Sequence, residues 1–458
     1  MEKENGNTNK VNGQPRLRTL YNGVYLSYFN QNKLDYQRKL YQEEKKNYTG
    51  NRKYFLHTLP LDNELIKSIE EIRTMFRNLW NTKRIPIGGN RKEDYQIIRD
   101  FKNLRLEDIN NVLREDNDGF WNVLWDFSPF DSGLNQYFSE MMNVDTVNGS
   151  VIDCLLDENR NRFIYGYETK ILCNPRVEIT EKNFFGMFKQ MCRISTNTQP
   201  VVNFPCKVGM WIISDSYFHT LSIYNGVPND HFVVSDFCSG WGSRLLSTLC
   251  MFHSLREDYL CRYGRQLHVT YLSTDPNSDV HDRFENIVLD WFEFIEPDDT
   301  RRYFHLEKGL LECQTPEFLE HCKTVLSNFG LAGVNVSFTS PPYFNREKYS
   351  EDEGQSFRRY PTYSEWRIGF LSEMIKNVHQ LLLPGMRFYL NISDTLEPNG
   401  DVNPMESDSC LFFQECGMTE VTTYKMVLSG KSDSKHKVNV GITEHKFEPV
   451  FVYQKSIQ

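Results

Sequence analysis

The tetrapeptide Ser340-Pro341-Pro342-Tyr343 carries the clearest chemical signal, and it follows a short apolar run at residues 334–339. Each proline ring restricts φ and removes an N–H, so the turn is rigid and its carbonyl groups remain free to accept hydrogen bonds. An exocyclic amine held there can donate one hydrogen to the Ser340 hydroxyl and one to the Pro341 carbonyl, while Tyr343 stacks on the attached ring. A structural Pro-Pro turn after a core strand is the alternative for the tetrapeptide alone.

A second apolar run, residues 231–237, ends beside Asp236 and leads into Cys238, Gly240 and Gly242. The two glycines permit a tight turn and close approach of a ligand to the backbone, and the periodicity of residues 245–255 predicts a helix after it. Any tight turn between a strand and a helix can contain a G-x-G pattern, so this signal is weak by itself.

A third run, residues 268–274, predicts a parallel strand that ends at Asp275. A carboxylate at the carboxyl end of such a strand is suited to two vicinal ribose hydroxyls, because open α/β sheets bind ligands at that edge. A helix N-cap or an Asx turn at Asp275 is compatible with the same pattern. Glu312, after a further expected strand, is a weaker candidate for the same edge.

Four segments of the chain resemble, in order, motifs X, I, II and IV of S-adenosylmethionine (SAM)-dependent DNA amino-methyltransferases. They are Asn203-Phe204-Pro205, residues 236–244, Asp275-Pro276-Asn277 and Ser340-Pro341-Pro342-Tyr343. Their residue sequences are close to those of phage and large-virus members of the family. The resemblance covers roughly residues 201–458, and motif IV is its most specific part. It implies an α/β, class I SAM-methyltransferase (Rossmann-like) sheet on the C-terminal side of the chain.

The resemblance also implies roles for individual residues. The catalytic segment would be Ser340, Pro341, Pro342 and Tyr343. Asp236 would hold the methionine end of SAM, Asp275 its ribose and Glu312 its adenine ring; the remaining residues expected at the cofactor are Phe204, Cys238, Gly240 and Gly242. The S-P-P-Y form implies methylation of the cytosine N4 amine of a flipped base in DNA, with adenine N6 second and RNA third.

Three positions depart from the family pattern: Ser243, Ser273 and Met386 each stand where glycine is usual. Each adds a side chain where backbone freedom is expected, which would narrow a cofactor site. A non-catalytic, methyltransferase-like subunit that binds nucleic acid therefore remains the alternative to an enzyme.

The region after motif IV, residues 344–360, is charged and lacks apolar periodicity, so we predict a substrate-side loop in which Arg358 and Arg359 meet phosphate. A solvated loop is the alternative. Thr362 and Glu365 then form a capping box that begins a helix ending before Pro384. Three strands are predicted after it, at residues 386–393, 421–428 and 449–454, the last two as an antiparallel pair.

The N-terminal region is basic although the whole chain has a formal net charge of −9. Residues 1–105 hold 21 Lys and Arg against 12 Asp and Glu, a balance of +9 that leaves −18 for the remainder. This excess predicts contact with DNA phosphates, with Lys83, Arg84, Arg91 and Lys92 as candidates beside a glycine turn. A basic face in contact with solvent alone is the alternative.

We predict two domains: residues 1–200, a mixed α+β region for nucleic-acid recognition, and residues 201–458, the catalytic domain. Within the first, residues 64–80 and 106–113 are predicted to be helical and residues 151–170 to form a β-hairpin. An aromatic cluster spans residues 119–142, and aromatic residues at this density are more typical of a core than of base stacking.

The composition is typical of a folded intracellular protein. With 458 residues and 39% hydrophobic content, the chain has enough apolar material for two cores. The eleven cysteines include no C-x-x-C pair, which favours reduced thiols over a disulfide frame or a zinc site, so we expect no metal. No run approaches the roughly 18 apolar residues of a membrane span, and no signal peptide is recognisable. The oligomeric state, homodimer or complex with a partner subunit, stays open.

Overall fold

The structure is a computed structural model. It describes residues 10–11, 14–15, 30–46, 48–50, 55–81, 109–126, 141, 144–146, 149–156, 158, 160–179, 184–196, 201, 203–277, 280, 284, 300–309, 311–349, 353–397, 399–428 and 436–457.

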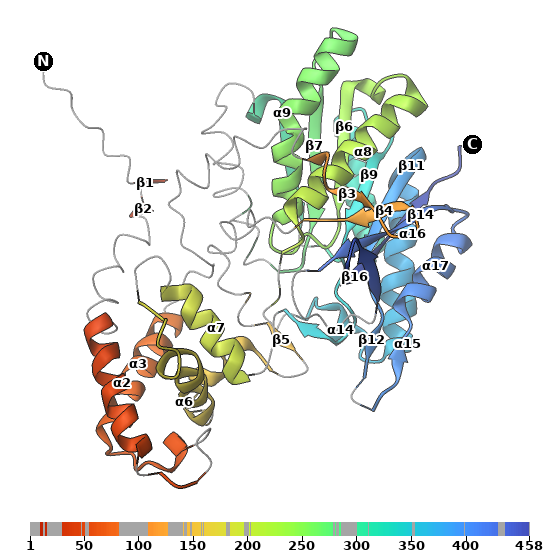
Figure 1. The fold of residues 1–458 in the computed structure, drawn as a ribbon. Helices are drawn as coiled ribbons and strands as arrows, with labels where there is room; N and C mark the ends of the chain where they lie inside the picture. Colours follow the sequence, from red (N-terminus) through yellow and green to blue (C-terminus); the bar gives the residue numbers. More distant parts are fainter. Residues whose placement is uncertain are drawn as a thin grey trace, which may run out of the picture. The chain divides into compact units, whose positions relative to one another are not determined.

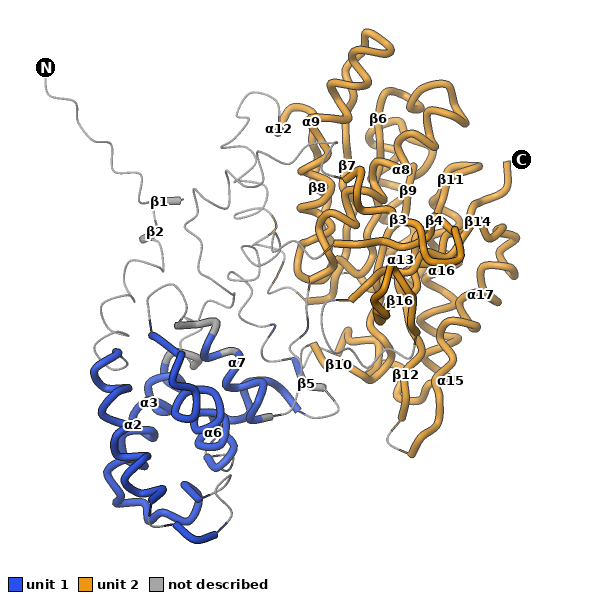
Figure 2. Tube along the Cα trace, in the orientation of Figure 1, with its two compact units in different colours: residues 1–92, 132–201 blue, residues 93–131, 202–458 orange. Residues whose placement is uncertain are grey.

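The chain divides into two compact units, coloured separately in Figure 2. Unit 1 comprises residues 1–92 and 132–201, and unit 2 comprises residues 93–131 and 202–458. The division near residue 201 lies close to the predicted boundary, but residues 93–131 fall in the second unit. The reason is that two strands of this segment extend the sheet of unit 2.

Unit 1 is helical in its described core. The elements are β1 (Lys10–Val11), β2 (Gln14–Pro15), α2 (Gln31–Lys46), a 3-10 helix (Phe55–Thr58), α3 (Glu64–Asn81), β5 (Asp145–Thr146), a second 3-10 helix (Val151–Leu155), α6 (Arg160–Tyr167), a π-helical turn (Glu168–Leu172) and α7 (Phe184–Thr196). The helix predicted at residues 64–80 is confirmed as α3.

The hairpin predicted at residues 151–170 is wrong, because this segment is helical throughout its described part. Four buried apolar side chains, Phe163, Ile164, Tyr167 and Ile171, recur at the spacing of one helix face. The polar residues that precede them favour a turn by composition, yet they contain the beginning of α6 at Arg160.

Unit 2 is built on one twisted sheet whose strand order is β3-β4-β14-β16-β11-β9-β6-β7-β8 (Figure 1). The strands are β3 (Leu113–Glu115), β4 (Trp121–Leu124), β6 (His231–Asp236), β7 (His268–Thr274), β8 (Phe304–Gly309), β9 (Val334–Thr339), β11 (Leu382–Asn391), β14 (Thr419–Val427) and β16 (Thr443–Gln454); β15 (Lys437–Val440) pairs with β16.

Strands β8, β7, β6, β9 and β11 are mutually parallel, and β16 runs antiparallel to both β11 and β14. Strand β14 is therefore parallel to these five. Six parallel strands with an antiparallel strand, β16, inserted before the last one are the class I methyltransferase arrangement, so the predicted fold class is confirmed. Strands β6, β7 and β9 are buried over nearly their whole length because helices cover both faces of the sheet.

Helices α8 (Cys206–Tyr224) and α9 (Ser243–Tyr263) pack together, α8 against β9 and β11 and α9 against β7. Helices α13 (Pro316–Asn328), α16 (Glu373–Leu381) and α17 (Met405–Glu415) form a cluster with buried side chains of β6, β9 and β11. The predicted capping box of Thr362 and Glu365 is confirmed at the start of α15 (Tyr363–Trp366). A π-helical turn (Arg367–Ser372) joins α15 to α16.

Strands β3 and β4 join the sheet through β14, more than 290 residues later in the chain, with Val123 opposite Lys425. The Lys425 Nζ lies 2.6 Å from an Asp116 carboxylate oxygen, an ion pair that links the two segments. Leu113, predicted to end a helix, instead begins β3, and residues 106–108 lie outside the described residues.

The remaining short elements of unit 2 are a 3-10 turn (Pro228–Asp230), α12 (Thr300–Tyr303), β10 (Glu347–Lys348), α14 (Ser356–Arg359), β12 (Thr395–Leu396) and β13 (Val402–Asn403). Among the residues that the structure describes, no helix combines the length and the apolar character that crossing a membrane requires.

Candidate active site

Four parallel strands, β6, β7, β9 and β11, end at one edge of the sheet, and this edge gathers the residues of motifs I, II and IV. Asp236 ends β6, Asp275 follows β7 and Ser340 follows β9. The edge is therefore the one at which open α/β sheets bind ligands.

Asp275 is joined to the motif I turn. The backbone N–H of Gly240 donates to one carboxylate oxygen across 2.9 Å, and the N–H of Asn277 donates to the other, also across 2.9 Å. Burial raises the pKa of Asp275 to about 6, and the two backbone hydrogen bonds lower it in part. A carboxylate oxygen has more than one acceptor position, so both oxygens of the half-buried Asp275 can accept a further donor.

Both glycines of the turn have positive φ, 54° at Gly240 and 80° at Gly242, a conformation that side chains rarely adopt. A Cβ on Gly242 would lie 2.9 Å from a ring carbon of Phe284. Glycine is thus required here for conformation at both positions and for space at the second.

Asp236 is almost fully buried and is occupied by protein donors. Its Oδ2 receives Arg244 Nε at 2.7 Å and the Tyr271 hydroxyl at 2.6 Å, and its Oδ1 receives Thr339 Oγ1 at 3.0 Å. Arg244 also donates to the Cys238 carbonyl. Through these contacts Asp236 holds Arg244 and the glycine turn in place.

Phe204 contacts the residue that follows the glycine turn. Its carbonyl accepts the Ser243 hydroxyl at 2.5 Å, and its ring meets Phe338 edge-to-face at a centroid distance of 4.8 Å. Ser243, which departs from the family pattern, therefore ties motif X to motif I.

The side chains of Ser273 and Met386, the other two positions where glycine is usual, also contact residues of the protein interior. Ser273 donates to the Glu307 carbonyl at 3.2 Å, and the sulfur of Met386 accepts the Thr220 hydroxyl at 3.3 Å. Both side chains are buried. Each of the three added side chains therefore has a structural partner.

Cys238 faces a second thiol. A hydrogen bond with Cys313 raises the pKa of Cys238 well above its ordinary value, and burial adds to the effect. A thiol in this state is a poor nucleophile, which agrees with a packing role.

Glu312 contacts the segment 344–360, which was predicted to be a substrate-side loop. Its carboxylate is 2.6 Å from a guanidinium nitrogen of Arg359 and accepts Gln314 Nε2 at 2.6 Å. Arg359, predicted to meet phosphate, is thus engaged in an ion pair, whereas Arg358 is the neighbouring residue of α14. A Cβ on Gly354 would lie 3.2 Å from a side-chain carbon of Pro276, so the chain at Gly354 lies close to the residue that follows Asp275.

The Ser340-Pro341-Pro342-Tyr343 turn contacts two residues that the sequence did not single out. Ser340 Oγ donates to Asn391 Oδ1 at 3.2 Å, and the Tyr343 hydroxyl donates to Glu448 Oε2 at 3.2 Å. Asn391 ends β11, the strand next to β9, and its available signal was a polar residue near the end of the strand predicted at residues 386–393. Glu448 had no local signal, because the strand predicted for this segment begins only at residue 449.

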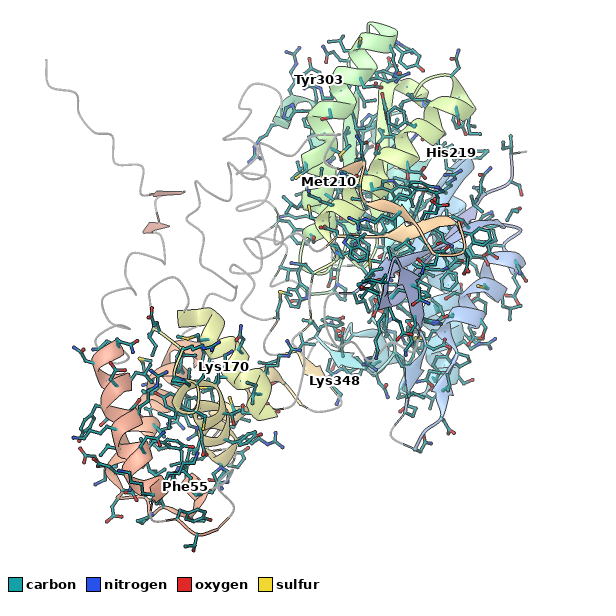
Figure 3. The ribbon with its side chains drawn as sticks, in the orientation of Figure 1. Phe55, Lys170, Met210, His219, Tyr303 and Lys348 are labelled. Atoms are coloured by element: carbon teal, nitrogen blue, oxygen red, sulfur yellow. The ribbon has the colours of Figure 1, made fainter. Side chains whose placement is uncertain are left out.

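The remaining predicted phosphate contacts, Lys83, Arg84, Arg91 and Lys92, lie outside the described residues, as do residues 127–140 of the aromatic cluster. Arg38, another basic residue of the N-terminal region, donates to the carbonyl groups of Ile171, Asn174 and Val177. Lys170, labelled in Figure 3, lies in the π-helical turn Glu168–Leu172, which also contains Ile171. The described residues contain no group of three or more His, Cys, Asp or Glu suited to a metal ion.

Comparisons with known proteins give structural likenesses only. No protein-family model matches the chain, and no curated protein sequence matches it. A candidate DNA modification methylase from Thermus thermophilus is 19% identical with a TM-score of 0.21, over 30% of this chain and 51% of its own length. TrmN from Thermus thermophilus is 13% identical with a TM-score of 0.26, over 55% and 49%. Loganic acid methyltransferase with SAH is 11% identical with a TM-score of 0.32, over 48% and 73%.

This chain therefore spans about half the length of the two Thermus proteins that it matches. The strand order of the sheet, rather than these likenesses, carries the fold assignment.

Proposed function

We propose that the chain is a SAM-dependent DNA methyltransferase that transfers a methyl group to the exocyclic amine of a flipped base, with cytosine N4 as the first choice. One observation carries the proposal: the Asp275–Gly240 contact and the Ser340-Pro341-Pro342-Tyr343 turn lie at the same edge of a sheet with the methyltransferase strand order. A cofactor site and an amine-accepting site are both required, and this edge offers residues for each.

The residues present fit SAM. Asp275 keeps acceptor positions for two ribose hydroxyls, and the positive-φ glycines expose backbone to a ligand. Glu312 and Phe204 flank the turn as further candidates for contact, while Asp236 acts through Arg244. When bound, SAM supplies an electrophilic methyl group.

The chain's own contribution is to make the amine nitrogen nucleophilic. The lone pair of a ring-conjugated amine is delocalised, so the nitrogen must move toward tetrahedral geometry. Ser340 and the Pro341 carbonyl favour that geometry by accepting the two amine hydrogens. Since Ser340 donates its own hydrogen to Asn391, its lone pairs remain available to accept an amine hydrogen. Once methylated, the nitrogen is cationic and releases one of its two protons to solvent. Because that proton is acidic, no strong general base is needed. Tyr343 offsets part of the roughly few kcal/mol lost when the base leaves the stack.

Product analysis tests the proposal. Unmethylated plasmid DNA, purified protein and SAM carrying a labelled methyl group should yield N4-methylcytosine after nucleoside digestion. N6-methyladenine as sole product would change the base assignment, and label in RNA alone would change the substrate. Binding of SAM with no transfer to either nucleic acid would favour the non-catalytic subunit.

A further inference from the structure

Glu448 is a carboxyl group at the amine-accepting end of the candidate site, supplied by a strand outside motifs I, II and IV. In register, Thr339 pairs with Leu390, and Asn391 pairs with Val450. Because β16 runs antiparallel to β11, Glu448 lies beyond the carboxyl end of β11, at the same edge as Ser340. Its position follows from the pairing of three strands.

The hydrogen bonds around Glu448 form a nearly closed path. The Tyr343 hydroxyl donates to Glu448, Ser340 donates to Asn391, and the Asn391 Nδ2 donates to the Pro449 carbonyl at 3.0 Å. The two ends of the catalytic tetrapeptide are thus linked to neighbouring residues of β16. Glu448 itself is half-buried, so it is neither a core residue nor a freely solvated one.

The surroundings of Glu448, burial first among them, oppose its ionisation on balance. Burial raises the pKa of Glu448, the negative charge of Glu347 on β10 raises it further, and hydrogen bonds from Tyr343 and Asn391 together with the positive charge of Arg346 lower it in part. Lys348, labelled in Figure 3, is the other residue of β10. Burial also raises the pKa of Glu347, and the repulsion acts on Glu448 where Glu347 is ionised.

A neutral carboxyl is both a donor and an acceptor, which a carboxylate is not. Cytosine and adenine each present a ring nitrogen with a free lone pair directly beside the exocyclic amine. On the pairing edge, thymine and guanine present an N–H beside a carbonyl oxygen at these positions; thymine has no exocyclic amine, and the amine of guanine lies on another carbon, between N1–H and N3. A carboxyl O–H beside an amine-accepting serine therefore matches the pairing edges of cytosine and adenine and not those of thymine and guanine.

We propose that Glu448 is a specificity-determining residue that donates, as a neutral carboxyl, to the ring nitrogen beside the target amine, N3 in cytosine. Asn391 is the positioning residue that holds the Ser340 hydroxyl as an acceptor for the amine. This inference rests on the proposed function and names how its site recognises the base. A ring-nitrogen acceptor beside Glu448 would raise the carboxyl pKa further, because it hydrogen-bonds the neutral form.

Three variants test the proposal in methyl transfer to unmethylated plasmid DNA: Glu448→Gln, Glu448→Ala and, as a control on the same strand, Glu444→Gln, whose partner is Lys437 at the exposed end of β16. Glutamine keeps one donor and one acceptor without titrating. Glu448→Gln should retain most of the wild-type rate and lose the decline that wild type shows as rising pH ionises Glu448. Glu448→Ala should lose roughly tenfold or more in kcat/KM, and Glu444→Gln should keep both the rate and the decline.

A substrate change gives a second readout that does not depend on the folding of a variant. An oligonucleotide carrying the mapped site with 3-deazacytosine at the target lacks the ring acceptor. The wild-type protein should methylate this oligonucleotide more slowly than the one with cytosine. Glu448→Ala should methylate the two oligonucleotides at nearly equal rates, since the variant and the substrate change each remove the same hydrogen bond.

Different results would overturn different claims. Equal rates and pH profiles in wild type and Glu448→Ala, or a Glu448→Gln variant as inactive as Glu448→Ala with unchanged SAM affinity, would reject the role of Glu448 alone. A wild-type protein that methylates no DNA base amine would reject the proposed function, and this inference with it.

Discussion

Arg244 Nε lies 2.7 Å from Asp236 Oδ2, and both side chains are buried at the carboxyl edge of the sheet, 8% and 1% exposed. The ion pair joins the end of β6 to the first turn of α9, on either side of the glycine turn. It therefore holds the backbone that carries Gly240 against Asp275.

Breaking this pair should destabilise unit 2. Arg244→Met leaves the Asp236 carboxylate buried without its cation, which is expected to lower the free energy of unfolding by about 3–5 kcal/mol. Urea unfolding measures the loss. Arg262→Met, which removes an exposed pair with Asp258 in the same helix, should change stability far less. Equal losses in the two variants would contradict a structural role for the buried pair.

The Asp275 pKa of about 6 predicts a pH-dependent affinity for SAM. The ionised carboxylate accepts the ribose hydroxyls, so the favourable interaction is present above about pH 6 and is lost as the pH falls through that value. Between pH 8 and pH 5 the SAM affinity should fall by about tenfold, the change in the ionised fraction. Calorimetry at both pH values measures it.

Asp275→Asn is the control for this titration, since it cannot ionise. It should bind SAM more weakly at pH 8, with an affinity that changes little between the two pH values. A wild-type affinity that is flat over this range would speak against ribose binding by Asp275.

Ser340→Ala and Tyr343→Ala should lose methyl transfer far more than SAM affinity, because both residues act on the base. Tyr343→Phe keeps the stacking ring and removes only the hydroxyl that donates to Glu448, so it should lose less. Single-turnover transfer and calorimetric SAM binding separate the two effects. A parallel loss of SAM affinity in all three variants would assign the turn to the cofactor instead.

Gly242→Ala tests the fit of the motif I turn. The added Cβ meets Phe284 at 2.9 Å in a backbone conformation of positive φ, so strain and overpacking add. Gly441→Ala has a similar φ of 62° and no atom within 4 Å of the added Cβ, so it measures the strain alone. Gly242→Ala should lose roughly 1–3 kcal/mol more stability than this control in urea unfolding. Identical losses would leave the steric contact without effect.

The basic N-terminal region predicts a salt-dependent affinity for DNA. Neutralising Lys83 and Arg84 together should flatten the slope of log affinity against log salt by about one to two units, at roughly 0.9 per phosphate contact. Arg38→Gln is a contrasting variant, because Arg38 already donates to three carbonyl groups within unit 1. It should lower stability and leave the slope unchanged. A slope unaffected by Lys83 and Arg84 would indicate a solvated basic face.

Local pattern was sufficient for several elements of unit 2. The strand at 268–274 matches β7 residue for residue, and the capping box of Thr362 and Glu365 begins α15 as predicted. Apolar runs, glycine turns and capping residues act over a few neighbours, so they can be read without the fold. The same holds for the order of motifs X, I, II and IV along the chain.

The segment 151–170 shows where local pattern was ambiguous. Its short apolar runs are compatible with two strands, yet Phe163, Ile164, Tyr167 and Ile171 are buried along one helix face. Short apolar runs do not distinguish the two structures by themselves, and packing against α7 supplies the difference.

Contacts between distant segments could be decided only in the tertiary structure. Asp236 carries a recognisable motif position, but Arg244, Tyr271 and Thr339 occupy its oxygens through three other elements. Glu448 lies 105 residues from Tyr343, and β4 pairs with β14 across the length of the chain. Residue types and short spacings encode which strands and turns form, whereas strand order and register set which side chains meet, because burial of the whole sheet selects the pairing.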